Sequence, residues 1–157
     1  MERFEGILQR SSVSFSIIDS LEQFPQWTAL YRYRNDLNDN IYINHCSVIA
    51  GLNWQSASLA LTTDIHHSQV RVFHALMANR ESGTLIFDYD IQEKLNQLDD
   101  NENIVIILDK HKLMDSMEFV VQQIDELNRD QQRRNICVIH PAELPFGTQL
   151  CLYRRKK

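Results

Sequence analysis

The sequence predicts an α/β fold, in the form of a three-layer sandwich with a mostly parallel central sheet. Apolar segments of strand length alternate with amphipathic segments of helix length along the 157 residues, as they do in this fold class. Residues 104–108 are five consecutive branched apolar residues, the pattern of a central strand buried on both faces. The last two expected strands, 136–139 and 149–153, are separated by too few residues for a crossover helix, so we expect the C-terminal strand to be antiparallel.

The first half of the chain is expected to alternate strands with helices. Val13, Phe15 and Ile17 alternate with serines, which indicates a strand that ends at Asp19. Because proline is tolerated in a first helical turn, a helix is expected to begin near Pro25 and to end before a turn rich in Asn and Asp. The elements expected next are an extended segment at 41–43, a segment at 45–52 that fits a strand or a helix, with the helix favoured, a strand at 58–63 and a helix at 65–79.

The second half is expected to continue this alternation. Asp115, with Glu118 three residues later, predicts an N-terminal cap for the longest helix, 116–134, which carries an apolar stripe at helical spacing. The other expected elements are a strand at 84–87, a helix at 91–98, the central strand at 104–108 and strands at 136–139 and 149–153.

Length and composition are those of one globular domain that spans residues 1–157. The sequence is 43% hydrophobic and 24% charged, which suits a sizeable apolar core. Residues 1–11 are expected to be a flexible start, and residues 154–157 a basic tail. Three cysteines without a C-x-x-C pair predict a reduced, cytoplasmic protein, and no apolar run approaches the roughly 18 residues of a membrane span.

The glycines argue against a nucleotide-binding loop. There are four of them: Gly6, Gly51, Gly83 and Gly147. Because each stands alone, neither common type of Gly-rich phosphate loop can form. The net charge of −5 also disfavours nucleic-acid binding through the overall field of the domain. The basic tail is expected to be a solvated end, and nucleic-acid contact is its alternative role. The residues that would make this contact are Arg154, Arg155, Lys156 and Lys157.

Aspartates stand at the ends of several expected strands, along the edge where open α/β sheets bind their ligands. Structural roles in turns and helix caps are favoured, because Asp is common at such positions. In the alternative, the carboxylates serve catalysis or hold Mg²⁺, an ion that prefers oxygen ligands. The candidate catalytic residues are Asp19, Asp64, Asp88, Asp90 and Asp109. The candidate Mg²⁺ ligands are Asp88, Asp90 and Asp109, and no other cofactor is expected.

The histidines and cysteines give weaker indications of a site. His67 and His74 are seven residues apart, which is wider than the usual spacing of a zinc-binding pair on a helix. Cys46 or Cys137 with His140 is the candidate for a nucleophilic pair. Cys137 lies in an expected buried strand, where a thiol is normally inert. Structural roles are therefore favoured for all of these residues.

Residues 41–153 resemble a known family. Residues 103–109, the long helix after them and residues 135–141 are similar to the second half of a RecA/KaiC-like ATPase core. In that core an apolar strand ends in the Walker B aspartate, matched here by Asp109, and the next strand lies beside it. Residues 58–64 and 81–88 also resemble the order of that core.

The expected phosphate loop departs from the family pattern. Residues 38–45 contain no glycine and no Gly-Lys-Ser/Thr, so a triphosphate would lack both its backbone cradle and its lysine. The chain therefore resembles members without the loop, such as the small Elongator subunits, recombinase paralogues and SulA-type division inhibitors. Those proteins keep the fold for assembly, which implies a structural role for Asp109.

Receiver domains are a second family with a partial resemblance. Asp19, Asp64 and Lys110 follow the order of an acid, a phospho-acceptor and a lysine at successive strand ends. Receivers usually carry two acids after the first strand, whereas Asp19 is followed by Ser20. This interpretation therefore ranks below the ATPase-like one.

These observations favour a non-catalytic α/β subunit or regulator that binds a protein partner, or forms a homo-oligomer, within a larger assembly. The reason is an ATPase-like order of elements without the loop on which such enzymes depend. One alternative is a Mg²⁺-dependent phosphoesterase or nucleotide-processing enzyme that uses the strand-end aspartates. The others are a nucleic-acid-binding accessory protein and a receiver-like signalling domain.

Overall fold

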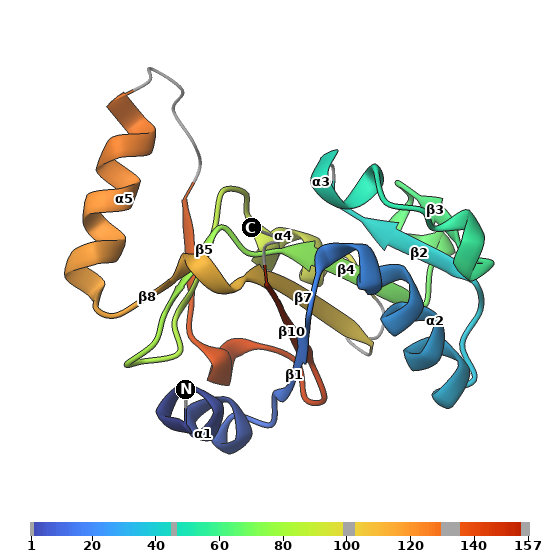
Figure 1. Cartoon of the computed structure of the whole chain (residues 1–157), viewed down its shortest axis with the longest axis horizontal. Helices are drawn as coiled ribbons and strands as arrows, with labels where there is room; N and C mark the ends of the chain where they lie inside the picture. Colours follow the sequence, from blue (N-terminus) through green and yellow to red (C-terminus); the bar gives the residue numbers. More distant parts are fainter. Residues whose placement is uncertain (1, 45–46, 99–102, 130–135, 155–157) are drawn as a thin grey trace.

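The computed structural model describes residues 2–44, 47–98, 103–129 and 136–154, which form two β-sheets with helices packed around them (Figure 1). The larger sheet has six strands, all parallel to their neighbours. Its strands, in spatial order, are β1 (Ser14–Ile18), β10 (Gln149–Tyr153), β7 (Ile104–Asp109), β4 (Val70–His74), β2 (Asn40–Ile43) and β3 (Ala60–Thr62). The predicted α/β class with a mostly parallel sheet is confirmed.

The C-terminal strand corrects one part of that prediction. β10 lies between β1 and β7 and is parallel to both, not antiparallel. The prediction of an antiparallel strand rested on the short connection before β10. It is wrong because the preceding strand, β9 (Cys137–Ile139), belongs to the other sheet. A short connection requires antiparallel strands only when the two strands pair with each other.

The smaller sheet has four strands in the order β8 (Leu113–Met114), β5 (Met77–Asn79), β6 (Leu85–Phe87) and β9. β6 is antiparallel to both β5 and β9, whereas β8 runs parallel to β5. Helix α5 (Met117–Arg129) packs over β5 and β8 at one end of the molecule (Figure 1). The ATPase-like resemblance implied that residues 136–139 lie beside β7, and this expectation is wrong because β4 and β10 flank β7.

Two apolar cores cover the two faces of the large sheet. Along β7, Ile104, Ile106 and Leu108 face one core, while Val105 and Ile107 face the other. This double burial is what the run of branched apolar residues predicted. The first core is closed by α1 (Glu2–Arg10), α4 (Ile91–Asn96) and the small sheet, and the second by α2 (Phe24–Arg34) and α3 (Ser47–Ala50). Short 3-10 helices connect these elements: η1 (Leu21–Gln23), η2 (Gln55–Ala57), η3 (Ile65–His67), η4 (Lys110–Lys112) and η5 (Pro141–Glu143).

The predicted helix at 65–79 is wrong. This segment forms η3 and then the strands β4 and β5. Its apolar residues fall at helical spacing, yet Val72 packs in one core and Phe73 in the other. A strand covered on both faces shows no alternation of polar and apolar residues, so its pattern resembles that of a buried helix.

The start of the chain also differs from the expectation of a flexible segment at 1–11. Residues 2–10 form the amphipathic helix α1, and the side chains of Phe4 and Leu8 are fully buried in the first core. These two residues are one helical turn apart and therefore face the sheet together.

Other elements keep their predicted type but change their length. The helix predicted at 45–52 contains α3, and its residues 45–46 lie outside the described residues. The long helix is described as far as Arg129, and residues 130–135 are likewise outside the described part of the chain. No helix in the described residues has the length and apolar character needed to cross a bilayer.

Candidate functional site

Three polar residues stand where adjacent central strands of the large sheet end. His74 ends β4, Asp109 ends β7 and Tyr153 ends β10, and Tyr153 is the direct register partner of Asp109. Each residue lies two positions after a residue of the second core, so all three side chains lie on the face that carries α2 and α3. We call this group the carboxyl-edge cluster.

The contacts of this cluster are short-range and polar. The Nε2 atom of His74 and the hydroxyl of Tyr153 are 3.4 Å apart in a hydrogen bond, and the two rings stack with centroids 6.3 Å apart. Asp109 is 2% exposed, and its Oδ1 accepts a hydrogen bond of 2.9 Å from the N–H of His111. The strand-end aspartate thus caps η4, and its charge also acts on the pKa of His74.

Burial lowers the pKa of His74 from its usual 6.5, and this effect outweighs the charges of Asp88 and Asp109, which raise the pKa. The imidazole is therefore neutral at pH 7 and has a nitrogen that can accept a proton. A half-buried neutral histidine beside two carboxylates and a tyrosine hydroxyl has the groups needed for general acid–base chemistry.

The state of His74 predicts a pH dependence of stability. The pKa of His74 is lower in the folded chain than in the unfolded chain, so the unfolded chain binds the proton more readily. The stability that depends on the neutral ring is complete above pH 6.5 and is lost as the pH falls below that value. In urea titrations at about pH 7.5 and about pH 5.5, the free energy of unfolding of wild type is expected to fall more than that of His74→Gln. Equal losses in the two proteins would contradict this assignment.

The five predicted aspartates do not gather at one place. The charges of Asp88 and Asp109 both raise the pKa of His74. Asp19 follows β1 and lies 3.9 Å from Arg154 in an exposed ion pair, while Asp64 lies beyond β3 at the opposite side of the sheet. Five strand spacings separate β1 from β3, or about 24 Å. Asp19 and Asp64 therefore cannot share a ligand with each other.

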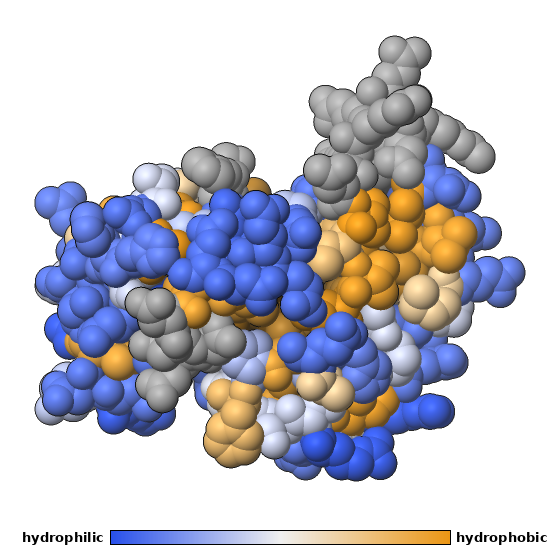
Figure 2. Space-filling view, turned by 180° about the vertical axis from the view of Figure 1, so that it is seen from behind, coloured by the Kyte–Doolittle hydropathy of each residue, from blue (hydrophilic) through white to orange (hydrophobic). Residues whose placement is uncertain are grey.

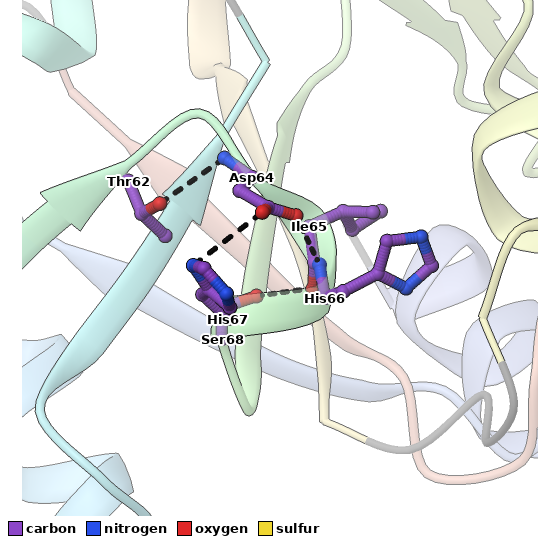
Figure 3. Close-up of polar contacts among 6 residues, drawn as sticks. All are labelled: Thr62, Asp64, Ile65, His66, His67 and Ser68. Atoms are coloured by element: carbon purple, nitrogen blue, oxygen red, sulfur yellow. Dashed lines mark hydrogen bonds and ion pairs between the residues drawn. The ribbon is translucent and has the colours of Figure 1, made fainter.

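Asp64 is engaged in local structure, as Figure 3 shows. Its Oδ1 accepts a hydrogen bond of 3.0 Å from the N–H of His66, and its Oδ2 lies 3.4 Å from Nδ1 of His67. Its own N–H donates to the Thr62 hydroxyl at 3.1 Å, and the buried Ser68 hydroxyl donates to the Ile65 carbonyl. These contacts are those of an N-cap for η3, the structural role that the sequence favoured for strand-end aspartates.

Asp90 has a similar structural role. Its Oδ1 accepts a hydrogen bond of 3.1 Å from the N–H of Glu93 and caps α4. Within the described ranges, no group of three or more His, Cys, Asp and Glu side chains is arranged to hold a metal ion. Mg²⁺ binding by Asp88, Asp90 and Asp109 stays a prediction of the sequence.

The cysteine and histidine candidates are not brought together in the described part of the chain. Cys151 is buried, and burial raises the pKa of its thiol to about 12, which keeps it protonated. Nδ1 of His140 accepts a hydrogen bond of 3.1 Å from the N–H of Ala142 and caps η5, at the end of the strand that holds Cys137. Cys46 lies outside the described residues. His74 is therefore the histidine whose surroundings point to chemistry, and the sequence missed this because it placed the residue on a helix.

A second surface of interest lies on α5 and β9. Met117, Val120, Val121 and Ile124 form one apolar stripe of α5, at the spacing i, i+3, i+4 and i+7. Val120 is fully buried against the small sheet, whereas Met117 is 41% exposed and Val121 is 52% exposed. Half of the apolar stripe therefore remains uncovered.

The adjacent sheet face is open as well. Ile86 of β6 is fully buried, but its register partner on β9, Val138, is 54% exposed because α5 packs over β5 and β8. Figure 2 shows a hydrophobic area on the side of the molecule that carries α5. We call Met117, Val121 and Val138 the α5–β9 apolar face.

Comparisons with known proteins establish the fold. The chain matches no protein-family model and no curated protein in sequence. It is similar to a crystal structure of a DUF162 family protein from Deinococcus radiodurans, with a TM-score of 0.65 and 9% identity. The similarity covers 98% of this chain and 94% of that chain. The two proteins share an α/β fold with a parallel sheet.

Proposed function

We propose that this chain is a non-catalytic subunit that binds another protein through the α5–β9 apolar face. The observation that supports this function is the apolar stripe of α5, which buries Val120 and leaves Met117 and Val121 exposed. An amphipathic helix normally turns its whole apolar stripe toward a core. The exposed half of the stripe and the neighbouring Val138 suit coverage by a partner.

Charges around the face indicate what kind of partner fits. Glu118 and Asp125 are exposed on α5 beside the apolar stripe. A partner with an apolar centre and a rim of Lys or Arg would match both features. A second copy that used the same face would bring the acidic rims together, so the occupant is a different protein.

The test is a pull-down with tagged wild type, Val121→Asp and Val138→Asp from cells of the source organism. The bound protein is identified by mass spectrometry, and the mass of the complex is measured by light scattering. We expect wild type to retain a stoichiometric amount of partner. Each variant is expected to retain at least tenfold less of it, because a buried unpaired carboxylate is costly. Leu30→Asp is the matched control, since Leu30 is 48% exposed on α2 and away from this face. A strict monomer with no retained partner, or equal loss in Leu30→Asp, would overturn the proposal.

The finer form of this proposal is a degenerate ATPase-like subunit without a phosphate loop. Its support is the buried strand β7, which ends in Asp109 as a Walker B strand ends in its aspartate. The strand order weakens it, because β9 does not lie beside β7. Protein binding through α5 and β9 does not depend on this ancestry.

A second candidate function is catalysis at the carboxyl-edge cluster, favoured by the neutral His74 next to Asp109 and Tyr153. The Mg²⁺-dependent phosphoester chemistry considered for the sequence would take place at this edge. Calorimetric titration with Mg²⁺, alone and with inorganic phosphate, tests it. Heat of binding that is lost in Asp109→Asn would support it, and no heat with an unchanged melting temperature would remove it.

Two further alternatives of the sequence stay predictions. Arg154 of the basic tail lies 3.9 Å from Asp19, and residues 155–157 are outside the described residues. Deletion of 154–157 would abolish salt-sensitive binding of single-stranded nucleic acid if the tail had that role. The receiver-like role of Asp64 gains no support, because the carboxylate is used as a cap.

A further inference from the structure

The outer edge of β1 lacks a strand partner in the described part of the chain. β1 is the first strand of the large sheet and has β10 on one side only. The N–H of Ser14 donates to a carbonyl beside β10 at 2.9 Å, and the carbonyl of Ile18 accepts from an N–H beyond β10 at 3.3 Å. Because alternate residues of a strand face the same neighbour, the main-chain groups of Phe15 and Ile17 point outward.

The composition of this edge favours pairing. Natural proteins usually protect an exposed edge strand with charged residues or proline. Residues 11–18 contain neither. Phe15 packs edge-on against Phe4 of α1, with ring centroids 6.1 Å apart. Ile17 lies on the same face two residues later and is 43% exposed.

We propose that two copies of this chain pair through β1, antiparallel and about a two-fold axis at Ser16. In this register Phe15 lies opposite Ile17 of the second copy, and Ile17 lies opposite Phe15 of the second copy. These residues are the ones whose main-chain groups point outward, so each pair exchanges two N–H···O=C hydrogen bonds. The two six-stranded sheets then form one continuous sheet.

The side chains fit the same register. The two Ser16 residues form the central pair without mutual hydrogen bonds, where Cα atoms approach to about 4.5 Å and side chains are closest. Serine is small enough for this position. On the other face, the ring of Phe15 covers the exposed Ile17 of the second copy, an aromatic–aliphatic cross-strand pair that is favourable in antiparallel sheets.

A groove extends the contact beyond β1. It has a volume of 520 Å³ and is lined in part by Ser12, Val13 and Phe146, the last of which is 86% exposed. The proposed register places the end of β1 of the second copy, Ile18 and Asp19, opposite Ser14 and Val13. The groove therefore lies where the second copy continues. This surface is separate from the α5–β9 apolar face, so the inference does not rest on the proposed function.

Cysteine cross-linking tests the register. With oxidised glutathione, Ser16→Cys is expected to form a disulfide-linked dimer on non-reducing gels, because the two Cα atoms lie within bridging distance. Ser14→Cys is the matched control on the same strand. Its two copies are four residue steps apart, about 13 Å along the strand, and cannot be bridged. Equal cross-linking at both positions, or none at position 16, would overturn the register.

The oligomeric state of the full chain tests the pairing itself. Light scattering and sedimentation are expected to give twice the chain mass for wild type and for Ile17→Val. Ile17→Pro removes the outward N–H without removing a bond to β10, so this variant is expected to be monomeric with an unchanged far-UV spectrum. Wild type that is monomeric at all concentrations, or Ile17→Pro that stays dimeric, would contradict the proposal. Val121→Asp is expected to leave the dimer intact, which separates this result from that of the proposed function.

Discussion

Replacing Phe24 with alanine is expected to lower the free energy of unfolding by about 3–5 kcal/mol. Phe24 is fully buried at the start of α2, where its ring stacks on Trp27 at 5.8 Å and meets the edge of Trp54 at 5.7 Å. The substitution leaves a cavity and removes two aromatic contacts, each worth about 0.5–1.5 kcal/mol. This core joins α2 to the residues around α3, so the loss affects one whole face of the large sheet.

Urea titration followed by far-UV circular dichroism measures this effect without relying on the two neighbouring tryptophans. Leu30→Ala in the same helix is the control, since Leu30 is 48% exposed and its truncation is expected to cost less than about 1 kcal/mol. Equal losses for Phe24→Ala and Leu30→Ala would contradict the described packing of α2.

Replacing Gly83 with alanine is expected to cost about 2–4 kcal/mol. Gly83 lies in the turn between β5 and β6 with φ of +76°, and its N–H donates to the Asn79 carbonyl at 2.8 Å. An added Cβ would lie 2.8 Å from Cγ2 of Ile7 and 3.1 Å from Cγ of Pro141. Glycine is therefore required at this position for two reasons: the positive φ of the backbone and the close approach of α1.

Gly147→Ala separates these two causes. Gly147 has a similar φ of +82°, but no atom lies within 4 Å of an added Cβ. Its substitution is expected to cost only the backbone strain, about 1–2 kcal/mol. Thermal and urea unfolding of the two variants would measure the difference, and a Gly147→Ala protein less stable than Gly83→Ala would show the turn contact with Ile7 to be unimportant.

The predictability of the fold varied with the surroundings of each strand. The run at 104–108 is so strongly apolar that only a central strand suits it, and β7 is that strand. β4 is also buried on both faces, but it includes Arg71 and His74. Its pattern of polar and apolar residues therefore resembles that of a helix. The direction of β10 could not be predicted, because it depends on which strand lies beside it and not on its own residues.

The candidate site was predictable only in part, for the same reason. Asp109 was recognised from its position at the end of an apolar strand. His74 and Tyr153 join it because β4 and β10 happen to flank β7, and neighbours in a parallel sheet are set by the path of the chain through space. The exposure of half of the α5 stripe could not be predicted either, since the sequence pattern of an apolar face is the same whether that face is covered or open.

The position of β10 has a consequence for the order of events during synthesis. β1 is the first strand of the large sheet to leave the ribosome and β10 is the last, yet β10 is the strand beside β1 within the described ranges of the chain. More than 130 residues separate the register partners Ser14 and Gln149, so this pairing closes the longest loop in the sheet. The nascent chain therefore carries β1 without its partner β10 until β10 has been made, and late, slow closure of the sheet follows from its topology.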